Sequence, residues 1–147
     1  AWTEAHYRTI NDKQHRAIAG LSMGGFHTMH TAALLNQSFD YVGIFSALYV
    51  PHTKQPHAER NIEMSYLALS DKPAYNQTEA LLQQQFANPP QLYWIACGVD
   101  DFLYEENVKF RKMLDAQAAE YEYCQSEGGH TWRNWRCYLA EFVQELF

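Results

Sequence analysis

The chain has 147 residues, of which 47% are hydrophobic and 19% are charged, enough for one modest domain with a core of its own. Its net charge of -6 at pH 7 disfavours nucleic acid or an anionic membrane surface as a partner, because both require concentrated Lys and Arg. No apolar run approaches the ~20 residues that span a bilayer, so a membrane-spanning protein is not expected.

Three cysteines, Cys97, Cys124 and Cys137, form no C-x-x-C pair. Their odd number disfavours a disulfide framework, and their spacing disfavours a zinc or redox site. Cys97 and Cys124 lie in strand-like stretches and are predicted to be buried thiols.

Short apolar runs alternate with segments of helical spacing. We expect strands at 15–21, 39–48, 91–98 and 122–126, and helices at 24–36, 105–122 and 131–147. This alternation predicts an α/β fold, with parallel strands, right-handed crossovers and flanking helices.

One long excursion, residues 51–90, separates the second and third strands. We interpret it as a lid or a substrate-binding segment within a single domain, 1–147. It has helical patterns at 61–70 and 76–86, and Asn76 with Glu79 would form a capping box on the second. His52 and His57 lie in it, and we interpret them as surface residues or substrate contacts.

The stretch Gly20-Leu21-Ser22-Met23-Gly24 matches G-x-S-x-G between an expected strand and an expected helix. In that setting the motif forms a sharp turn that presents the serine above the end of a sheet. The glycines would allow the close approach of strand and helix. Ser22 is therefore a candidate nucleophile, and the Met23 N–H, at a helix N-terminus, is a candidate oxyanion donor.

A serine nucleophile needs a base and a carboxylate that orients the base. His130 lies in the turn "SEGGHTW" between the fourth strand and the last helix, and is the candidate base. "CGVDDFLYEEN" follows the third strand and offers Asp100 and Asp101. The order Ser, Asp, His is that of α/β-hydrolases.

Three stretches in this order, "AIAGLSMGG", "CGVDDFLYEEN" and "GGHTWRNWRCYLAEFVQELF", resemble the C-terminal half of the esterase D-like family. That family includes feruloyl esterases of carbohydrate esterase family one, enterochelin esterase-like proteins and S-formylglutathione hydrolase. The resemblance spans nearly the whole chain and implies the C-terminal half of an α/β-hydrolase fold. It places the catalytic acid in G-x-x-D, which falls on Asp101, and leaves Asp100 as a turn residue or an acidic residue at a helix start.

The resemblance also implies a function. It indicates a serine carboxylic-ester hydrolase that needs no cofactor and acts on feruloyl or acetyl esters of plant polysaccharide. An enzyme with such a substrate would be secreted or periplasmic. The alternatives are another ester or thioester hydrolase, of the enterochelin or S-formylglutathione type, an acyltransferase, or an inactive fragment or binding module.

In the family, earlier strands and a second oxyanion donor precede the nucleophile motif. The chain begins at Ala1 without them, so we expect a fragment or a cleaved product. Its partner would be the N-terminal half as a separate chain, or a second copy of itself.

Aromatic residues are expected near the mouth of the site. Trp132, Phe102 and Tyr49 are candidates to contact an aryl or sugar group, whereas Trp135 fits the core. His27 and His30 are three residues apart on one helix, but no H-E-x-x-H pattern or third ligand accompanies them, so no metal is predicted.

Overall fold

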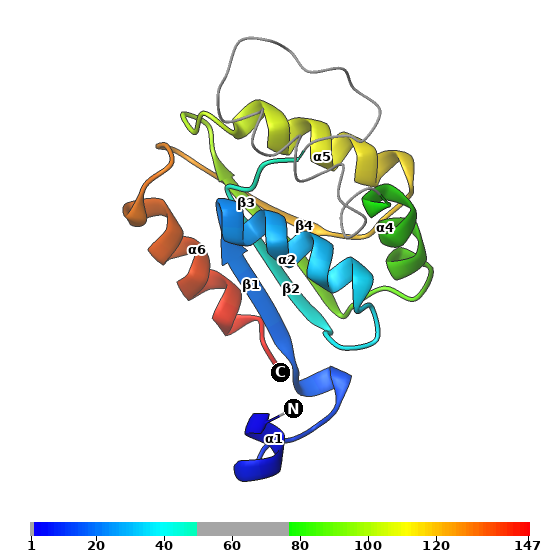
Figure 1. Cartoon of the computed structure of the whole chain (residues 1–147). Coiled ribbons are helices and arrows are strands. Elements are labelled where there is room, and N and C mark those ends of the chain that lie inside the picture. Colours follow the sequence, from blue (N-terminus) through cyan, green and yellow to red (C-terminus); the bar gives the residue numbers. More distant parts are fainter. Residues whose placement is uncertain (1, 50–76) are drawn as a thin grey trace.

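A computed structural model describes residues 2–49 and 77–147. Four parallel strands form one sheet in the order β1-β2-β3-β4, with β1 at Ala17–Leu21, β2 at Tyr41–Phe45, β3 at Leu92–Gly98 and β4 at Glu122–Ser126. The expected α/β architecture of parallel strands with flanking helices is confirmed (Figure 1).

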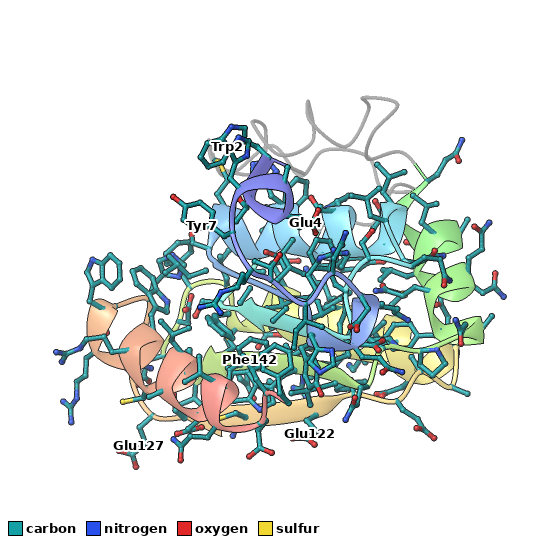
Figure 2. All side chains as sticks on the ribbon, turned by 90° about the horizontal axis from the view of Figure 1, so that it is seen from below. Trp2, Glu4, Tyr7, Glu122, Glu127 and Phe142 are labelled. Atoms are coloured by element: carbon teal, nitrogen blue, oxygen red, sulfur yellow. The ribbon has the colours of Figure 1, made fainter. Side chains whose placement is uncertain are left out.

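Helices cover both faces of the sheet. Helices α2 (Met23–Leu34), α4 (Thr78–Ala87) and α5 (Tyr104–Ala116) lie on one face, and α6 (Trp132–Gln144) lies on the other (Figures 1 and 2). Two short turns of helix, α1 (Trp2–His6) and η1 (Lys13–His15), precede β1. In the part of the chain that the structure describes, no helix is long and apolar enough to cross a bilayer.

The two middle strands carry the core. Every residue of β2 and β3 is buried, whereas β1 and β4 are only partly buried. The larger apolar cluster packs α2, α4 and α5 against the sheet, and the smaller one packs Tyr138 and Phe142 of α6 on the opposite face. Continuous burial explains why these strands read as unbroken apolar runs.

The expected boundaries needed correction where the backbone turns sharply. Strand β2 ends at Phe45 instead of residue 48, because Ser46 has a φ of 46° and leaves the extended conformation. The helix expected at 105–122 ends at Ala116. There Ala118 takes a φ of 52°, and the N–H groups of Ala118 and Ala119 donate to Asp115 and Leu114. This is a Schellman ending without its usual glycine.

Of the excursion at 51–90, the structure describes only the last part. The predicted helix at 76–86 corresponds to α4, whose N-cap is Gln77, and the Gln77 side chain makes no capping hydrogen bond. Asn76, the other member of the predicted capping box, lies outside the described residues. Glu79 accepts a hydrogen bond from the Tyr49 hydroxyl at 2.7 Å. The pattern at 61–70, with His52 and His57, lies outside the described residues.

His30 illustrates how the core constrains ionisation. Its side chain is buried in α2, and its Nδ1 donates to the Phe26 carbonyl at 2.7 Å. Burial lowers the pKa of His30 from 6.5 to about 4, because the charged imidazolium is poorly solvated there. Of the two histidines that lie three residues apart on this helix, His27 and His30, the second is thus a core residue.

We predict that His30 makes the protein acid-sensitive. Between pH 6.5 and pH 4 the unfolded state binds a proton that the folded state does not, so stability falls as the pH falls. At pH 5 the loss relative to pH 7 amounts to about 2 kcal/mol from this group. Urea unfolding of the wild type and of His30→Gln at pH 5 and pH 7 measures this loss of stability. An equal pH dependence in the two proteins would contradict the prediction.

Candidate active site

Ser22 lies at the corner between β1 and α2. Its φ of 54° and ψ of -120° lie in a region that non-glycine residues rarely adopt, at a cost of about 1–3 kcal/mol. Two backbone hydrogen bonds hold the corner: the Ser22 N–H donates to the Phe45 carbonyl at 2.8 Å, and the Ser22 carbonyl accepts from the Phe26 N–H at 3.1 Å. The strained turn of a nucleophile elbow is therefore present.

The neighbouring glycines differ in their roles. A Cβ on Gly20 would lie 2.3 Å from the Gly24 carbonyl oxygen, and a Cβ on Gly25 would lie 2.8 Å from the Ala47 side chain. A Cβ on Gly24 would meet no described atom within 4 Å. Close approach of strand and helix thus requires Gly20 and Gly25, whereas Gly24, which completes the motif, is not required for packing among the described residues.

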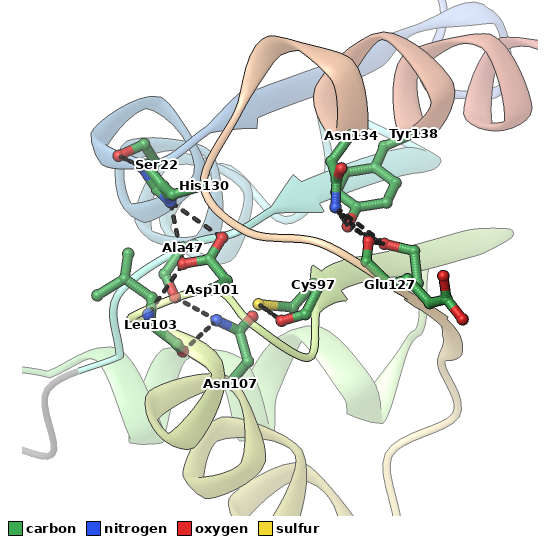
Figure 3. A network of polar contacts seen from close by, with 12 residues as sticks. Ser22, Ala47, Cys97, Asp101, Leu103, Asn107, Glu127, His130, Asn134 and Tyr138 are labelled. Atoms are coloured by element: carbon green, nitrogen blue, oxygen red, sulfur yellow. Dashed lines mark hydrogen bonds and ion pairs between the residues drawn. The ribbon is translucent and has the colours of Figure 1, made fainter.

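His130 contacts both Ser22, which lies 108 residues earlier in the sequence, and Asp101, which lies 29 residues earlier. His130 Nε2 is 2.8 Å from Ser22 Oγ, and His130 Nδ1 is 3.0 Å and 3.1 Å from the two oxygens of Asp101 (Figure 3). An ionised carboxylate only accepts hydrogen bonds, so the proton belongs on Nδ1 and leaves Nε2 free to accept from the serine hydroxyl. The structure thus joins the three predicted residues in one hydrogen-bonded chain from Ser22 through His130 to Asp101.

The aspartate is buried and fixed in place. Asp101 is 4% exposed, and its Oδ1 also accepts from the Leu103 N–H at 2.9 Å. Asn107, a buried residue of α5, donates to the Leu103 and Ala47 carbonyls, both at 2.8 Å. It therefore joins the loop of the acid to the segment after β2. Sequence reasoning missed Asn107, because it reads as an ordinary polar position on a helix.

Asp100 also has a defined place. Its N–H donates to the Gly128 carbonyl, and its carboxylate accepts from the Gly128 N–H, both at 3.1 Å. The turn residue expected from the resemblance therefore pairs the loop that carries the acid with the loop that carries the base.

The Met23 N–H is in the first turn of α2, where backbone donors have no partner within the helix. The helix dipole adds partial positive charge at this end. The start of α2 can therefore stabilise a negatively charged oxygen next to Ser22.

Two of the three predicted aromatic contacts are exposed. The ring centroids of Phe102 and His130 are 4.6 Å apart, and Phe102 is 51% exposed. Trp132 is 69% exposed, and its ring packs edge-on against Trp135. Trp135, predicted as core, packs edge-on against His130 at 4.8 Å as well as against the smaller apolar cluster. Tyr49 is not supported as a substrate contact, because its ring is buried against Phe110 and its hydroxyl bonds to Glu79.

Comparison with known proteins identifies the family of the chain. The Esterase family, described as "Putative esterase", matches residues 1–146. The chain belongs to this family. An acetyl esterase of Caldicellulosiruptor saccharolyticus is 32% identical to the chain over 84% of its residues and 51% of the relative.

Solved structures resemble the fold of this esterase-family chain. A ferulic acid esterase matches 99% of this chain and 57% of its own, with 29% identity and a TM-score of 0.73. S-formylglutathione hydrolase from Staphylococcus aureus matches 97% of this chain and 55% of its own, with 20% identity and a TM-score of 0.72. The chain thus spans about half the length of these relatives.

We predict that Gly20→Ala disrupts the elbow, whereas Gly24→Ala is tolerated. The new methyl group at position 20 would overlap backbone atoms that cannot move independently, which we expect to cost more than about 3 kcal/mol. The matched variant Gly24→Ala places its methyl in open space on a helix, where alanine is favoured. Thermal melting of both variants tests this, and equal melting temperatures would contradict it.

Proposed function

We propose that the protein is a serine carboxylic-ester hydrolase in which Ser22 is the nucleophile, His130 the general base and Asp101 the orienting acid. The observation that carries the proposal is the hydrogen-bonded chain from Ser22 Oγ through His130 to Asp101. Family membership and the acetyl-esterase relative support it.

The proposed reaction has two halves. Ser22 Oγ attacks the ester carbonyl carbon while His130 Nε2 takes the hydroxyl proton, and the tetrahedral intermediate then expels the alcohol, which receives that proton from His130. Water attacks the resulting acyl-serine by the same route, which releases the carboxylic acid and restores Ser22. Asp101 stays ionised and stabilises the imidazolium. The chemistry requires no cofactor.

The oxyanion would be held in part by the Met23 N–H, whose position at the start of α2 favours negative charge. A second donor has not been assigned to any described residue of this chain. We propose that it comes from the part of the protein that corresponds to the uncovered half of the relatives.

For substrates, we propose feruloyl or acetyl esters of plant polysaccharide. The relatives named as a ferulic acid esterase and an acetyl esterase support this class. The exposed rings of Phe102 and Trp132 beside the triad suit an aromatic acyl or sugar group. Such a substrate would place the enzyme outside the cytoplasm.

The surface of the described residues has a place where a further part of the protein could join the sheet. On its outer side β1 pairs with no described strand. Between β1 and α6 lies a largely apolar groove of about 180 Å³, lined in part by Leu21, Trp132 and Leu139. We propose that the remaining part of the protein, supplied as the same or a separate chain, covers this edge, with self-association as the competing outcome.

Our third prediction concerns the triad. Ser22→Ala and His130→Gln should each lower the hydrolysis of feruloyl and acetyl esters on the order of 10⁴-fold or more, without loss of the fold. Labelling by a fluorophosphonate, followed by intact mass spectrometry, should locate the adduct on Ser22. His27→Gln serves as the matched control and should retain activity. Near-wild-type turnover in Ser22→Ala would refute the proposal, and added alcohol that outcompetes water would indicate an acyltransferase.

Our fourth prediction concerns the missing donor. Residues 1–147 alone should hydrolyse esters roughly 10²–10³-fold more slowly than the same chain combined with the segment equivalent to the uncovered half of the acetyl-esterase relative, because one oxyanion donor is worth that much. Sedimentation with activity assays distinguishes a hetero-complex from a self-associated form. Full activity in a monomeric 147-residue chain would contradict the prediction.

A further inference from the structure

A buried asparagine stands beneath the loop that carries His130. Asn134 lies in the first turn of α6 and is 7% exposed. Residues 127–131, which include His130, connect β4 to this turn. Asn134 is not one of the three residues of the proposed triad.

The nitrogen of its amide group contacts three oxygen atoms. Nδ2 lies 2.8 Å from the Glu127 carbonyl oxygen and 3.1 Å from both Ser126 Oγ and Tyr138 Oη (Figure 3). The amide has two hydrogens, so one donates to Glu127 and the other is shared between the two hydroxyls. Those hydroxyls are 2.6 Å apart and bond to each other. Asn134 thus joins the end of β4, the following loop and the next turn of α6.

Packing limits movement of the same loop. Gly128 has a φ of 81°, and a Cβ there would lie 3.0 Å from Asn134 Oδ1. A Cβ on Gly98, at the end of β3, would lie 2.8 Å from Asn134 Nδ2 and 2.0 Å from the Gly128 carbonyl oxygen. The asparagine therefore leaves no room for a side chain at Gly128, in the loop that carries His130, or at Gly98, the last residue of the strand that precedes Asp101.

The loop is held from two directions. Asn134 binds the Glu127 carbonyl from α6, while Asp100 exchanges two hydrogen bonds with the backbone of Gly128. His130 follows only two residues later, and its ring must meet Ser22 and Asp101 at 2.8–3.1 Å. A displacement of about 1 Å in such a contact can lower a rate roughly 10²-fold.

We propose that Asn134 is a positioning residue that sets the place of His130 by fixing residues 126–128 beneath it. The inference rests on the proposed function, since it concerns the base of the ester hydrolase. It assigns Asn134 no contact with substrate. The buried polar cluster of Ser126, Asn134 and Tyr138 acts on catalysis only through the loop.

The test combines reactivity with a direct view of the histidine. In the full protein, Asn134→Ala should slow fluorophosphonate labelling of Ser22 and lower kcat by about 10-fold to 10²-fold, with KM changed less than about twofold. The His130 Nδ1–H should give a low-field proton NMR signal in the wild type, assigned by its absence in His130→Gln. That signal should be lost or broadened in Asn134→Ala.

Two further variants keep the test decisive. Asn134→Asp retains the side-chain volume but replaces the donor by an acceptor, and should act in the same direction if Asn134→Ala does not fold. Gln85→Ala is the matched control, because Gln85 is also a buried amide on a helix, donating to the Ala32 carbonyl. It should lower the melting temperature without changing labelling or the signal.

The outcomes separate the two hypotheses. Wild-type labelling rates and an intact Nδ1–H signal in both Asn134 variants would overturn the inference, as would an equal loss in Gln85→Ala. Absence of ester hydrolysis in the wild type would refute the proposed function, while the NMR signal would still report whether Asn134 positions His130.

Discussion

The register of the parallel sheet is the constraint on which the site depends. Leu21 pairs with Phe45, Phe45 with Ala96, and Gly98 with Ser126, so β1 and β2 end at one level and β3 and β4 end two residues further on. Because parallel strands deliver their carboxyl ends to one edge, the residues that follow β1, β3 and β4 meet there. The triad contacts of 2.8–3.1 Å follow from that alignment together with the local turns.

Hydrogen bonds from a neighbouring strand or loop hold both sharp turns of the site. Ser22 adopts a positive φ, which is strained for serine, and the Phe45 carbonyl of the neighbouring strand accepts from its N–H. Gly128 also has a positive φ, which glycine adopts without strain, and Asp100 binds its backbone from the adjacent loop. A change in one loop should therefore be felt in its neighbour.

The sequence predicted the elements and also named Ser22, His130 and Asp101, which the structure brings together, because the elements and the motifs leave local signals. Apolar runs mark the buried strands, and G-x-S-x-G between a strand and a helix marks the elbow. It did not predict the early end of α5 at Ala116. This helix ending depends on Ala118, which takes the positive-φ position that glycine usually fills. Tyr49 was predicted near the site, but a partner 30 residues away, Glu79, holds it in the core. Long-range contacts of this kind have no periodic signature.

Two buried asparagines show that local sequence signals also miss the groups that support the site. Asn107 and Asn134 are the buried groups that tie the acid loop and the base loop to the scaffold, yet both read as polar helix positions. A motif specifies the groups that react, whereas their precision depends on backbone carbonyls that only the folded structure brings together. Two glycines illustrate this difference: a Cβ on Gly24, which belongs to the motif, would meet no described atom within 4 Å, whereas Gly98 lies outside the motif and has no room for a side chain. Sequence motifs therefore locate an active site better than they describe what holds it in place.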